Sequence, residues 1–253
     1  MMQAARRRMS EARARGLARL AAALLCAAIA LRPGAAASAD LLEPFEASYA
    51  WLWHGAAVAV SRVKLEHRAG DIWVYSSSSE PRGLGMLYPL RPVMRSVLRV
   101  SPEGVRPLSY QATDGTSANE RGADLKFDWD AMRVTGVYES VPVDLPLERG
   151  VQDDLSIQIA LLLALRQGRA PGDLLLIDKN TVRRYSYSRE NDETITTRLG
   201  PTQTIVFASQ HEDSPRVTRF WCAPSKGFVP VRVQQKRVDS VEWTMEIENL
   251  DTP

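Results

Sequence analysis

From residue 45 onward, apolar and polar residues alternate along most of the chain with a period of two, the period of a half-buried β-strand. The first run shows this clearly, because Phe45, Tyr49 and Trp51 share one face of the predicted strand. Short polar or glycine-containing turns separate successive runs, whereas parallel strands would need long crossover connections. The pattern therefore predicts an antiparallel meander.

The alternation divides into two series of strands on either side of a central apolar segment. The first series comprises residues 45–53, 56–66, 72–79, 93–100, 105–112, 123–129, 132–138 and 141–147, and the second comprises 174–179, 181–189, 193–199, 202–211, 216–222, 229–238 and 240–250. We expect a mainly β fold, an antiparallel curved sheet or barrel of about 12–14 strands. One continuous barrel is favoured over two domains, because the loops are too short to mark a linker.

Residues 153–167 break the alternation and predict a helix. Asp153 and Asp154 open the segment, where acidic groups favour the positive end of the helix dipole, and Arg166 and Gly168 close it. The segment is apolar on nearly all sides, so we expect a buried helix packed in or against the sheet.

A second interruption, residues 81–92, is apolar but rich in glycine and proline. Leu84, Met86 and Tyr88 lie between Gly83 and Pro89. The segment predicts a short helix or a loop that folds over an opening.

Residues 1–39 have the order of a secretory signal peptide. Arginines come first, an apolar run extends from Leu20 to Leu31, and small residues end at Ala39. The run is shorter than the roughly 20 residues that a membrane-spanning helix needs. We expect cleavage after Ala39, which leaves residues 40–253 as a single β-rich periplasmic domain without a transmembrane anchor.

Two other export routes are disfavoured. Cys26 lies inside the apolar run after Leu25, whereas a lipid-modified cysteine follows a small residue, so we interpret it as part of the removed signal. The triplet Arg6-Arg7-Arg8 lacks the residues that follow a twin-arginine pair.

Charge narrows the range of partners. The chain carries 32 Lys and Arg against 30 Asp and Glu, but seven of the arginines and one glutamate lie in the signal segment. The remaining domain is therefore mildly acidic, with no general attraction to nucleic acid or anionic lipid. We expect no nucleic-acid partner.

Motifs for chemistry are sparse. His54, His67 and His211 lack metal-ligand spacing, and there is no Gly-x-Ser-x-Gly hydrolase signature. The pair Asp153-Asp154 is interpreted as a helix cap rather than a catalytic pair. We therefore expect no catalytic residue, no metal and no cofactor, while a serine triad assembled from distant residues stays open.

Aromatic and apolar residues offer candidates for a ligand cavity. Such rings either line a pocket or simply fill the interior of a small barrel, and we favour filling. The cavity candidates are Trp51, Trp53, Trp73, Leu84, Met86, Tyr88, Trp129, Leu161, Leu165 and Trp221. Arg183 and Arg184 are interpreted as an exposed or edge strand face, and Cys222 as a half-buried structural residue.

Several short motifs in order resemble the bacterial domain of unknown function 3108 family, exported proteins of Gram-negative bacteria. The matching residues are 44–49 (PFEASY), 72–77 (IWVYSS), 105–110 (VRPLSY), 127–129 (FDW), 153–156 (DDLS) and 220–224 (FWCAP), followed by Gly227 and 230–232 (PVR). The resemblance implies an envelope protein with a β-rich, barrel-like fold, and it brings no catalytic residues.

Two functions are weighed equally at this point. One is a non-enzymatic periplasmic protein that binds a lipid or another apolar small molecule inside the curved sheet. The alternative is a cell-envelope scaffold or assembly factor that acts by protein–protein interaction with another envelope protein. An extracytoplasmic hydrolase ranks third, because such enzymes can hide their site residues from inspection of the sequence.

Overall fold

A computed structural model describes residues 41–88 and 90–252. The expected signal peptide at residues 1–39 lies outside the described residues. Within the described part of the chain, no helix has both the length and the apolar character that crossing a bilayer requires.

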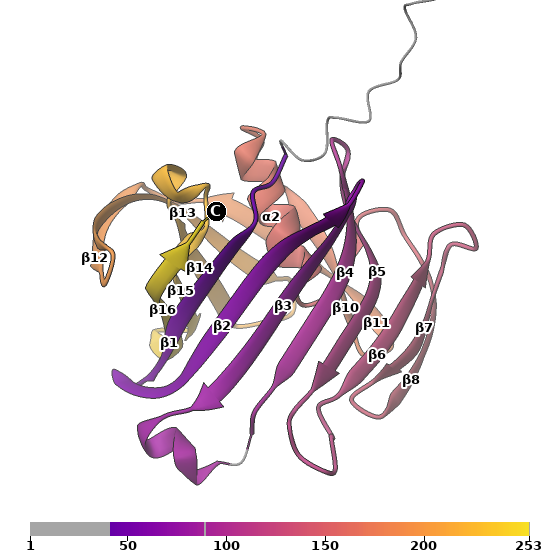
Figure 1. The fold of residues 1–253 in the computed structure, drawn as a ribbon, viewed down its shortest axis with the longest axis horizontal. Coiled ribbons are helices and arrows are strands. Elements are labelled where there is room, and N and C mark those ends of the chain that lie inside the picture. The colour runs from indigo at the N-terminus through magenta and orange to yellow at the C-terminus, as the bar shows by residue number, and fades with distance from the viewer. Residues whose placement is uncertain (1–40, 89, 253) are drawn as a thin grey trace, which may run out of the picture. The chain divides into compact units, whose positions relative to one another are not determined.

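The secondary structure alternates short turns with strands on both sides of one α-helix (Figure 1). The elements are β1 (Phe45–Trp53), β2 (Ala56–Ala69), β3 (Ile72–Pro81), the 3-10 helix η1 (Gly83–Leu87), β4 (Val93–Ser101), β5 (Gly104–Thr113), β6 (Ala123–Asp128), β7 (Arg133–Tyr138), β8 (Val141–Pro146), β9 (Val151–Gln152), α2 (Ser156–Arg166), β10 (Asp173–Asp178), β11 (Thr181–Arg189), β12 (Glu193–Thr197), β13 (Gly200–His211), β14 (Arg216–Cys222), the 3-10 helix η2 (Pro224–Lys226), β15 (Pro230–Arg237) and β16 (Ser240–Asp251).

Within the described residues, all the strands belong to one 16-stranded sheet, more than the predicted 12–14 strands. Strands β1 to β8 lie side by side in chain order, and the other edge of β1 pairs with β16. The order then continues through β15, β14, β13, β11 and β10 to β9, while β12 pairs with the first part of β13. Every pairing is antiparallel except the short parallel contact between β9 and β10.

The predicted class, a mainly β fold built on a curved antiparallel sheet, is confirmed. The closed-barrel alternative is wrong, because β8 and β9 end the strand order and are not paired with each other in the described part of the chain. Pro142 and Pro146 lie in β8 and lack the N–H groups that a further strand would need. The two-residue strand β9 was not predicted, because so short a segment carries no periodic signal.

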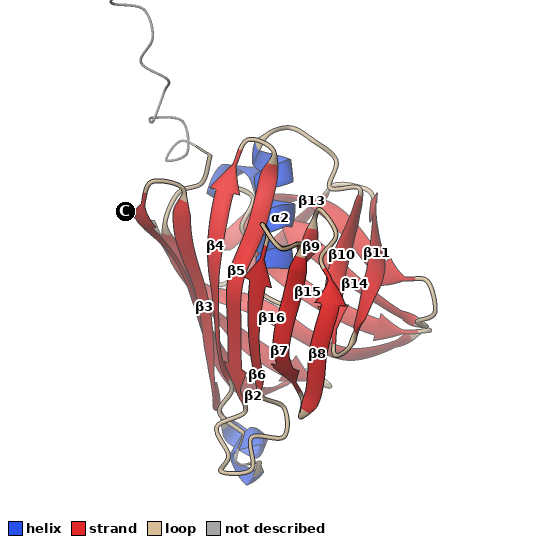
Figure 2. Ribbon diagram, turned by 90° about the vertical axis from the view of Figure 1, so that its right-hand side faces the viewer, coloured by secondary structure: helices blue, strands red, loops and turns tan. Residues whose placement is uncertain are grey.

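Helix α2 lies within the curve of the sheet, near the end opposite η1 (Figures 1 and 2). Its apolar side chains are buried on two sides, as the all-round apolar sequence predicts. Ile159 and Leu163 join the main core, whereas Leu161 and Leu165 pack in a second cluster that contains Phe207 of β13. Burial of each such Leu or Ile side chain contributes about 1.5–3 kcal/mol to the stability of the fold. Because the helix packs against both halves of the sheet, it fixes the spacing between them.

Carboxylates at the start of α2 tie the helix to the first half of the sheet. Asp153 accepts hydrogen bonds from the backbone N–H groups of Leu155 and Ser156, which confirms its capping role. Its second carboxylate oxygen accepts the hydroxyl hydrogen of Ser96 in β4 at 2.7 Å. Asp154 does not cap the helix; its side chain instead accepts from the hydroxyl groups of two tyrosines of the sheet, Tyr110 and Tyr138.

Burial raises the pKa values of both Asp153 and Asp154. Asp153 is 1% exposed, and burial raises the pKa of its carboxyl to about 6, partly offset by the hydrogen bonds from Ser156, Ser96 and Leu155. Burial also raises the pKa of Asp154 above its ordinary value, against the effect of hydrogen bonds from Tyr138 and Tyr110. In the unfolded chain the pKa of an Asp carboxyl returns to about 3.9.

The raised pKa of Asp153 predicts a specific pH dependence of stability. Between about pH 6 and pH 4 the folded state binds a proton that the unfolded state does not bind, so this group adds stability as the pH falls. We expect Asp153→Asn to remove that contribution. The difference in melting temperature between the wild type and Asp153→Asn, measured by circular dichroism from pH 7.5 to 4.5, should move in favour of the wild type as the pH falls. A difference that stays constant with pH would contradict the prediction.

Candidate ligand-binding cleft

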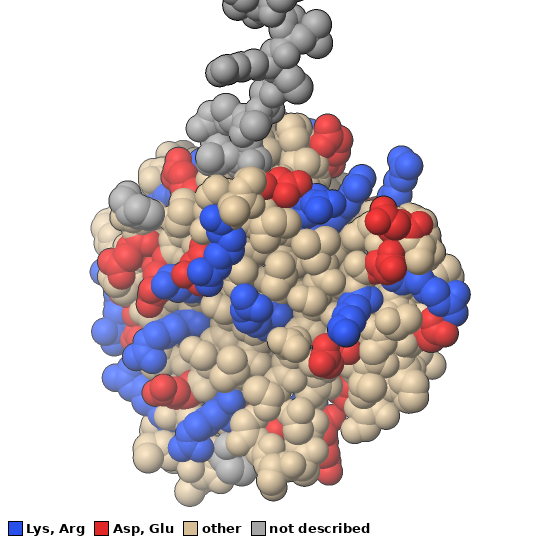
Figure 3. Space-filling model, turned by 45° about the vertical axis from the view of Figure 1, so that its right-hand side comes forward, with Lys and Arg blue, Asp and Glu red and all other residues tan. Residues whose placement is uncertain are grey.

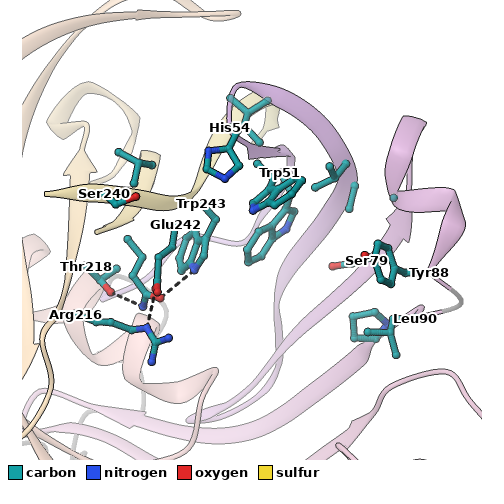
Figure 4. Close-up of a pocket in the computed structure, with 18 of the residues that line it drawn as sticks. Trp51, His54, Ser79, Tyr88, Leu90, Arg216, Thr218, Ser240, Glu242 and Trp243 are labelled. Atoms are coloured by element: carbon teal, nitrogen blue, oxygen red, sulfur yellow. Dashed lines mark hydrogen bonds and ion pairs between the residues drawn. The ribbon is translucent and has the colours of Figure 1, made fainter. Parts of the chain in front are cut away.

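The end of the sheet that α2 does not fill contains a cleft of about 1330 Å³ (Figure 4). Both halves of the sheet contribute to it, together with η1 and the residues that follow η1. The lining residues used below are Trp51, Trp53, Val58, Ser79, Leu84, Tyr88, Leu90, Asp178, Arg183, Tyr185, His211, Arg216, Thr218, Gln235, Glu242 and Trp243.

Two tryptophans from neighbouring strands form the aromatic part of the lining. The ring centroids of Trp51 in β1 and Trp243 in β16 are 4.9 Å apart. The indole N–H of Trp51 donates to the hydroxyl of Ser61, and that of Trp243 donates to the amide oxygen of Gln235. Because both polar N–H groups are satisfied inside the protein, the ring faces are available for an apolar ligand.

The segment after β3 adds an apolar flank to this aromatic part. Tyr88 and Leu90 lie across the cleft from Trp243 in Figure 4. A β-bulge in β2 leaves the carbonyl of Val58 free to accept the backbone N–H of Arg82. This hydrogen bond starts the η1 turn directly against β2.

Glycine is required at one position of that turn. Gly85 lies so close to β2 that a Cβ atom added there would overlap the carbonyl group of Val58. This close approach holds η1 against β2, and the apolar side chains of Leu84, Met86 and Leu87 point away from the strand.

A second part of the cleft lining, which adjoins Trp243 in Figure 4, is polar and charged. Arg183 forms an ion pair with Asp178 at 2.5 Å, and Arg216 forms one with Glu242 at 2.7 Å. The hydrogen bond from Arg216 is the largest influence that holds the pKa of Glu242 below its ordinary value. Positive and negative charges on this side therefore compensate each other in pairs.

His211 connects the charged pairs with the aromatic residues. It is buried at the end of β13, where its Nε2 contacts the guanidinium of Arg183 and its Nδ1 accepts the backbone N–H of Asp213. The ring of Tyr185 meets the imidazole edge to face, with the centroids 5.6 Å apart. This contact network fixes both the Arg183 and the His211 side chains at the cleft.

Four of the cavity candidates from the sequence lie together at this cleft. Trp51, Trp53, Leu84 and Tyr88 all line it. Their clustering follows from the turns that end β1 and β3, because these turns lie at the same end of the sheet.

Six other candidates lie elsewhere, so their assignment to a shared cavity is corrected. Met86 projects from η1 into solvent, and Trp129 donates its indole N–H to Pro107 outside the cleft. The remaining four are packed in the interior or between α2 and the second half of the sheet: Trp73, Leu161, Leu165 and Trp221. Large apolar residues at these positions fill space, which is the interpretation of the tryptophans that the sequence analysis favours.

The polar side of the cleft was missed from the sequence. Arg183 is exposed, as interpreted from the sequence, but it also lines the cleft, while Arg184 pairs with Asp173 outside it. His211 and Arg216 stand at the two ends of the β13–β14 turn. Their meeting with Arg183 depends on the β11–β13 pairing, which the sequence pattern does not specify.

Two further chemical features can be placed. Cys222 is fully buried, and burial raises the pKa of its thiol to about 12, which suits a structural role. No group of three or more His, Cys, Asp or Glu residues within 41–88 and 90–252 is arranged to hold a metal ion.

The fold and the cleft together define a class of protein. In this class an open, curved antiparallel sheet packs around a helix at one end and leaves a cleft open to solvent at the other end. The chain belongs to the DUF3108 family of proteins of unknown function, whose family model matches residues 44–246. The resemblance inferred from the sequence motifs is thereby confirmed. No functionally curated protein matches the chain.

One solved structure supports the fold assignment. A β-barrel-like protein of domain of unknown function DUF1849 from Brucella abortus is similar, with a TM-score of 0.55 and 10% sequence identity, over 84% of this chain and 98% of that chain. A candidate lipoprotein from Parabacteroides distasonis (TM-score 0.36, 8% identity, 83% of this chain and 96% of that chain) and a candidate exported protein with a YmcC-like fold from Bacteroides fragilis (0.36, 12%, 83% and 94%) are more distant. At these identities the likeness to the Brucella protein concerns the fold alone.

Proposed function

We propose that the protein is a non-enzymatic, periplasmic binding protein that holds an amphipathic lipid in the cleft. The observation that carries this proposal is the mixed lining of the cleft, in which the aromatic rings of Trp51, Trp243 and Tyr88 occur together with the ion-paired side chains of Arg183 and Arg216. The acyl chain of such a ligand fits the aromatic part of this lining, and its polar head fits the ion-paired part. The volume of about 1330 Å³ also exceeds the roughly 300–1,000 Å³ of ordinary small-molecule pockets, which suits a chain-bearing ligand.

The pairing of charges on the polar side limits the head group. Arg183 and Arg216 each have a carboxylate partner already, so a strongly anionic head would have to compete with Asp178 and Glu242. A neutral or zwitterionic head can accept hydrogen bonds there without breaking either ion pair. We therefore propose a head group of that kind, with the acyl chain against the tryptophans.

The proposal includes the compartment in which the protein acts, the periplasm. Residues 1–39 have the basic, apolar and small-residue order of a secretory signal, which supports export to the periplasm. A lipid-binding protein in that compartment meets its ligand at the membranes on either side.

Native mass spectrometry tests the proposal directly. Protein purified from the periplasm without denaturation should carry a co-purifying adduct with a lipid mass. Addition of phospholipid or fatty acid to protein stripped of that adduct should raise its melting temperature. Absence of both an adduct and a thermal shift would refute the binding function.

Removal of one aromatic ring from the cleft should weaken binding. We expect Trp243→Ala to reduce the affinity for the fluorescent fatty acid cis-parinaric acid about tenfold or more, because a buried aromatic contact contributes about 1.5–3 kcal/mol. The measurement is a fluorescence titration.

Trp129→Ala provides the matched control, because it removes the same ring outside the cleft. Near-ultraviolet circular dichroism should show that both variants keep a packed core. Equal affinities of the two variants would place the fatty acid somewhere other than the cleft.

A further inference from the structure

An exposed apolar knob projects from the rim of the cleft. It consists of four consecutive large residues apart from one glycine, and their exposed fractions are 63% for Leu84, 74% for Met86, 81% for Leu87 and 69% for Tyr88. In Figure 2, η1 extends beyond the strand ends, at the end of the sheet away from α2. We refer to these four residues as the apolar tip.

The backbone keeps the tip in this exposed position. The N–H of Arg82 donates to the carbonyl of Val58 at 2.7 Å, and the N–H of Tyr88 donates to the carbonyl of Gly85 at 2.9 Å. Because Gly85 is in close contact with β2, the turn cannot rotate to bury Met86 and Leu87 against the sheet. Exposure of these large apolar side chains is therefore built into the turn.

Charge around the tip differs from that of the mildly acidic domain. Between Arg82 and Pro92 the chain carries two arginines, Arg82 and Arg91, and no acidic residue. Arg82 shares the carboxylate of Glu248 with Arg198. Figure 3 shows mainly uncharged atoms at the bottom of the molecule, where η1 lies, with both basic and acidic side chains around them.

We propose that the apolar tip docks the protein on the surface of a phospholipid bilayer that contains anionic lipids. A projecting knob of Leu, Met and Tyr fits the deformable boundary between head groups and acyl chains, where tyrosine is favoured, better than a rigid protein surface. Arginines that flank such a knob lie at the depth of the phosphates and are attracted to anionic head groups. This preference for anionic lipids comes from the arginines beside the tip, and the net charge of the domain does not produce it.

Docking in this orientation places the cleft at the membrane. Leu84 and Tyr88 line the cleft as well as belonging to the tip, so the membrane contact and the cleft mouth are continuous. Met86 and Leu87 face away from the cleft lining. The docking proposal therefore does not depend on what the cleft binds, and the two can be tested separately.

The test uses the protein purified from the periplasm, produced with Cys26→Ser and carrying an environment-sensitive nitrobenzoxadiazole label at Met86→Cys. Cys222 is buried and stays unlabelled in the folded protein. Vesicles of phosphatidylethanolamine and phosphatidylglycerol (3:1) should shift the label emission to shorter wavelength, whereas vesicles of phosphatidylcholine alone should bind more weakly. The same label at Glu103→Cys, in the β4–β5 turn at the α2 end, should keep its emission in water.

A substitution experiment complements the label. The double variant Met86→Ser, Leu87→Ser should sediment with the anionic vesicles about tenfold less strongly than the wild type, because two apolar contacts are lost. Met132→Ser, a half-exposed methionine in the β6–β7 turn away from the tip, is the control and should bind like the wild type. Equal emission shifts at positions 86 and 103, equal binding to both vesicle types, or wild-type sedimentation of the double variant would each overturn the proposal. Cis-parinaric acid binding should be unchanged in the double variant.

Discussion

Asp153→Ala is expected to lower the free energy of unfolding by about 3 kcal/mol at pH 7. Truncation removes the acceptor of three hydrogen bonds, from the backbone N–H groups of Leu155 and Ser156 and from the hydroxyl of Ser96. All three donors lie in a buried region, and each buried donor that loses its partner costs about 1–3 kcal/mol, partly offset because the costly burial of the carboxylate is also removed. Urea denaturation followed by tryptophan fluorescence measures the change.

Asp153→Asn separates the hydrogen bonds from the charge. The asparagine oxygen can accept from the two backbone N–H groups, and its NH₂ group can donate to Ser96. We expect this variant to be at least as stable as the wild type at pH 7, since burial raises the pKa of the Asp153 carboxyl and thus disfavours its ionised form. Asp130→Ala, in an exposed turn, should change stability by less than about 0.5 kcal/mol. A cost of less than about 1 kcal/mol for Asp153→Ala would contradict the anchoring role of this residue.

Gly136→Ala is expected to disrupt the β6–β7 pairing and to lower the free energy of unfolding by about 3 kcal/mol or more. Gly136 has φ = +144°, and a Cβ atom there would overlap the carbonyl oxygen of Asp124 on the paired strand. Backbone strain and steric overlap therefore act together. Tyr138, two residues along β7, donates to Asp154, so displacement of β7 should also loosen the start of α2.

Gly104 offers a matched control for this substitution. Its φ is +149°, close to that of Gly136, but nothing lies within 4 Å of an added Cβ atom. Gly104→Ala should therefore show the cost of backbone strain alone, about 1–2 kcal/mol. Urea denaturation gives both values, and hydrogen exchange should show faster exchange of β6–β8 amides only for Gly136→Ala. Equal costs for the two variants would rule out the steric contribution.

Periodicity predicted the strands well because each one buries a single face. The alternation in residues 45–53 and the all-round apolar run that became α2 reflect burial directly, and burial decides both elements. The predicted helix began three residues too early, because Asp153 and Asp154 precede the helix that they help to anchor. Closure of the sheet could not be predicted, since it depends on whether β8 and β9 meet, and neither strand carries a signal for its partner.

Some of the residues that line the cleft can be recognised in the sequence, and others cannot. Trp51 and Trp53 in β1 and Tyr88 after η1 are visible in the sequence as apolar residues near turns, and they line part of the cleft. Arg183 meets His211 because β11 pairs with β13 rather than with β12, and Arg216 follows His211 across the β13–β14 turn. A charged residue near a strand end gives the same sequence signal whether it faces solvent or a cleft, so pattern alone did not distinguish these residues.

Pairing of the first strand with the last has a consequence for how the protein acquires its structure. Each half of the sheet is built largely from neighbours in the chain, but the two halves are joined edge to edge through β1 and β16. Contacts between such distant residues form slowly, because a long loop must close first. During vectorial synthesis or export, β1 emerges early and has to remain with one edge unpaired until residues 240–251 follow. Truncation from the carboxyl terminus should therefore be far more damaging to folding than the loss of a dozen residues would suggest, and a chaperone that shields the waiting edge of β1 would accelerate maturation.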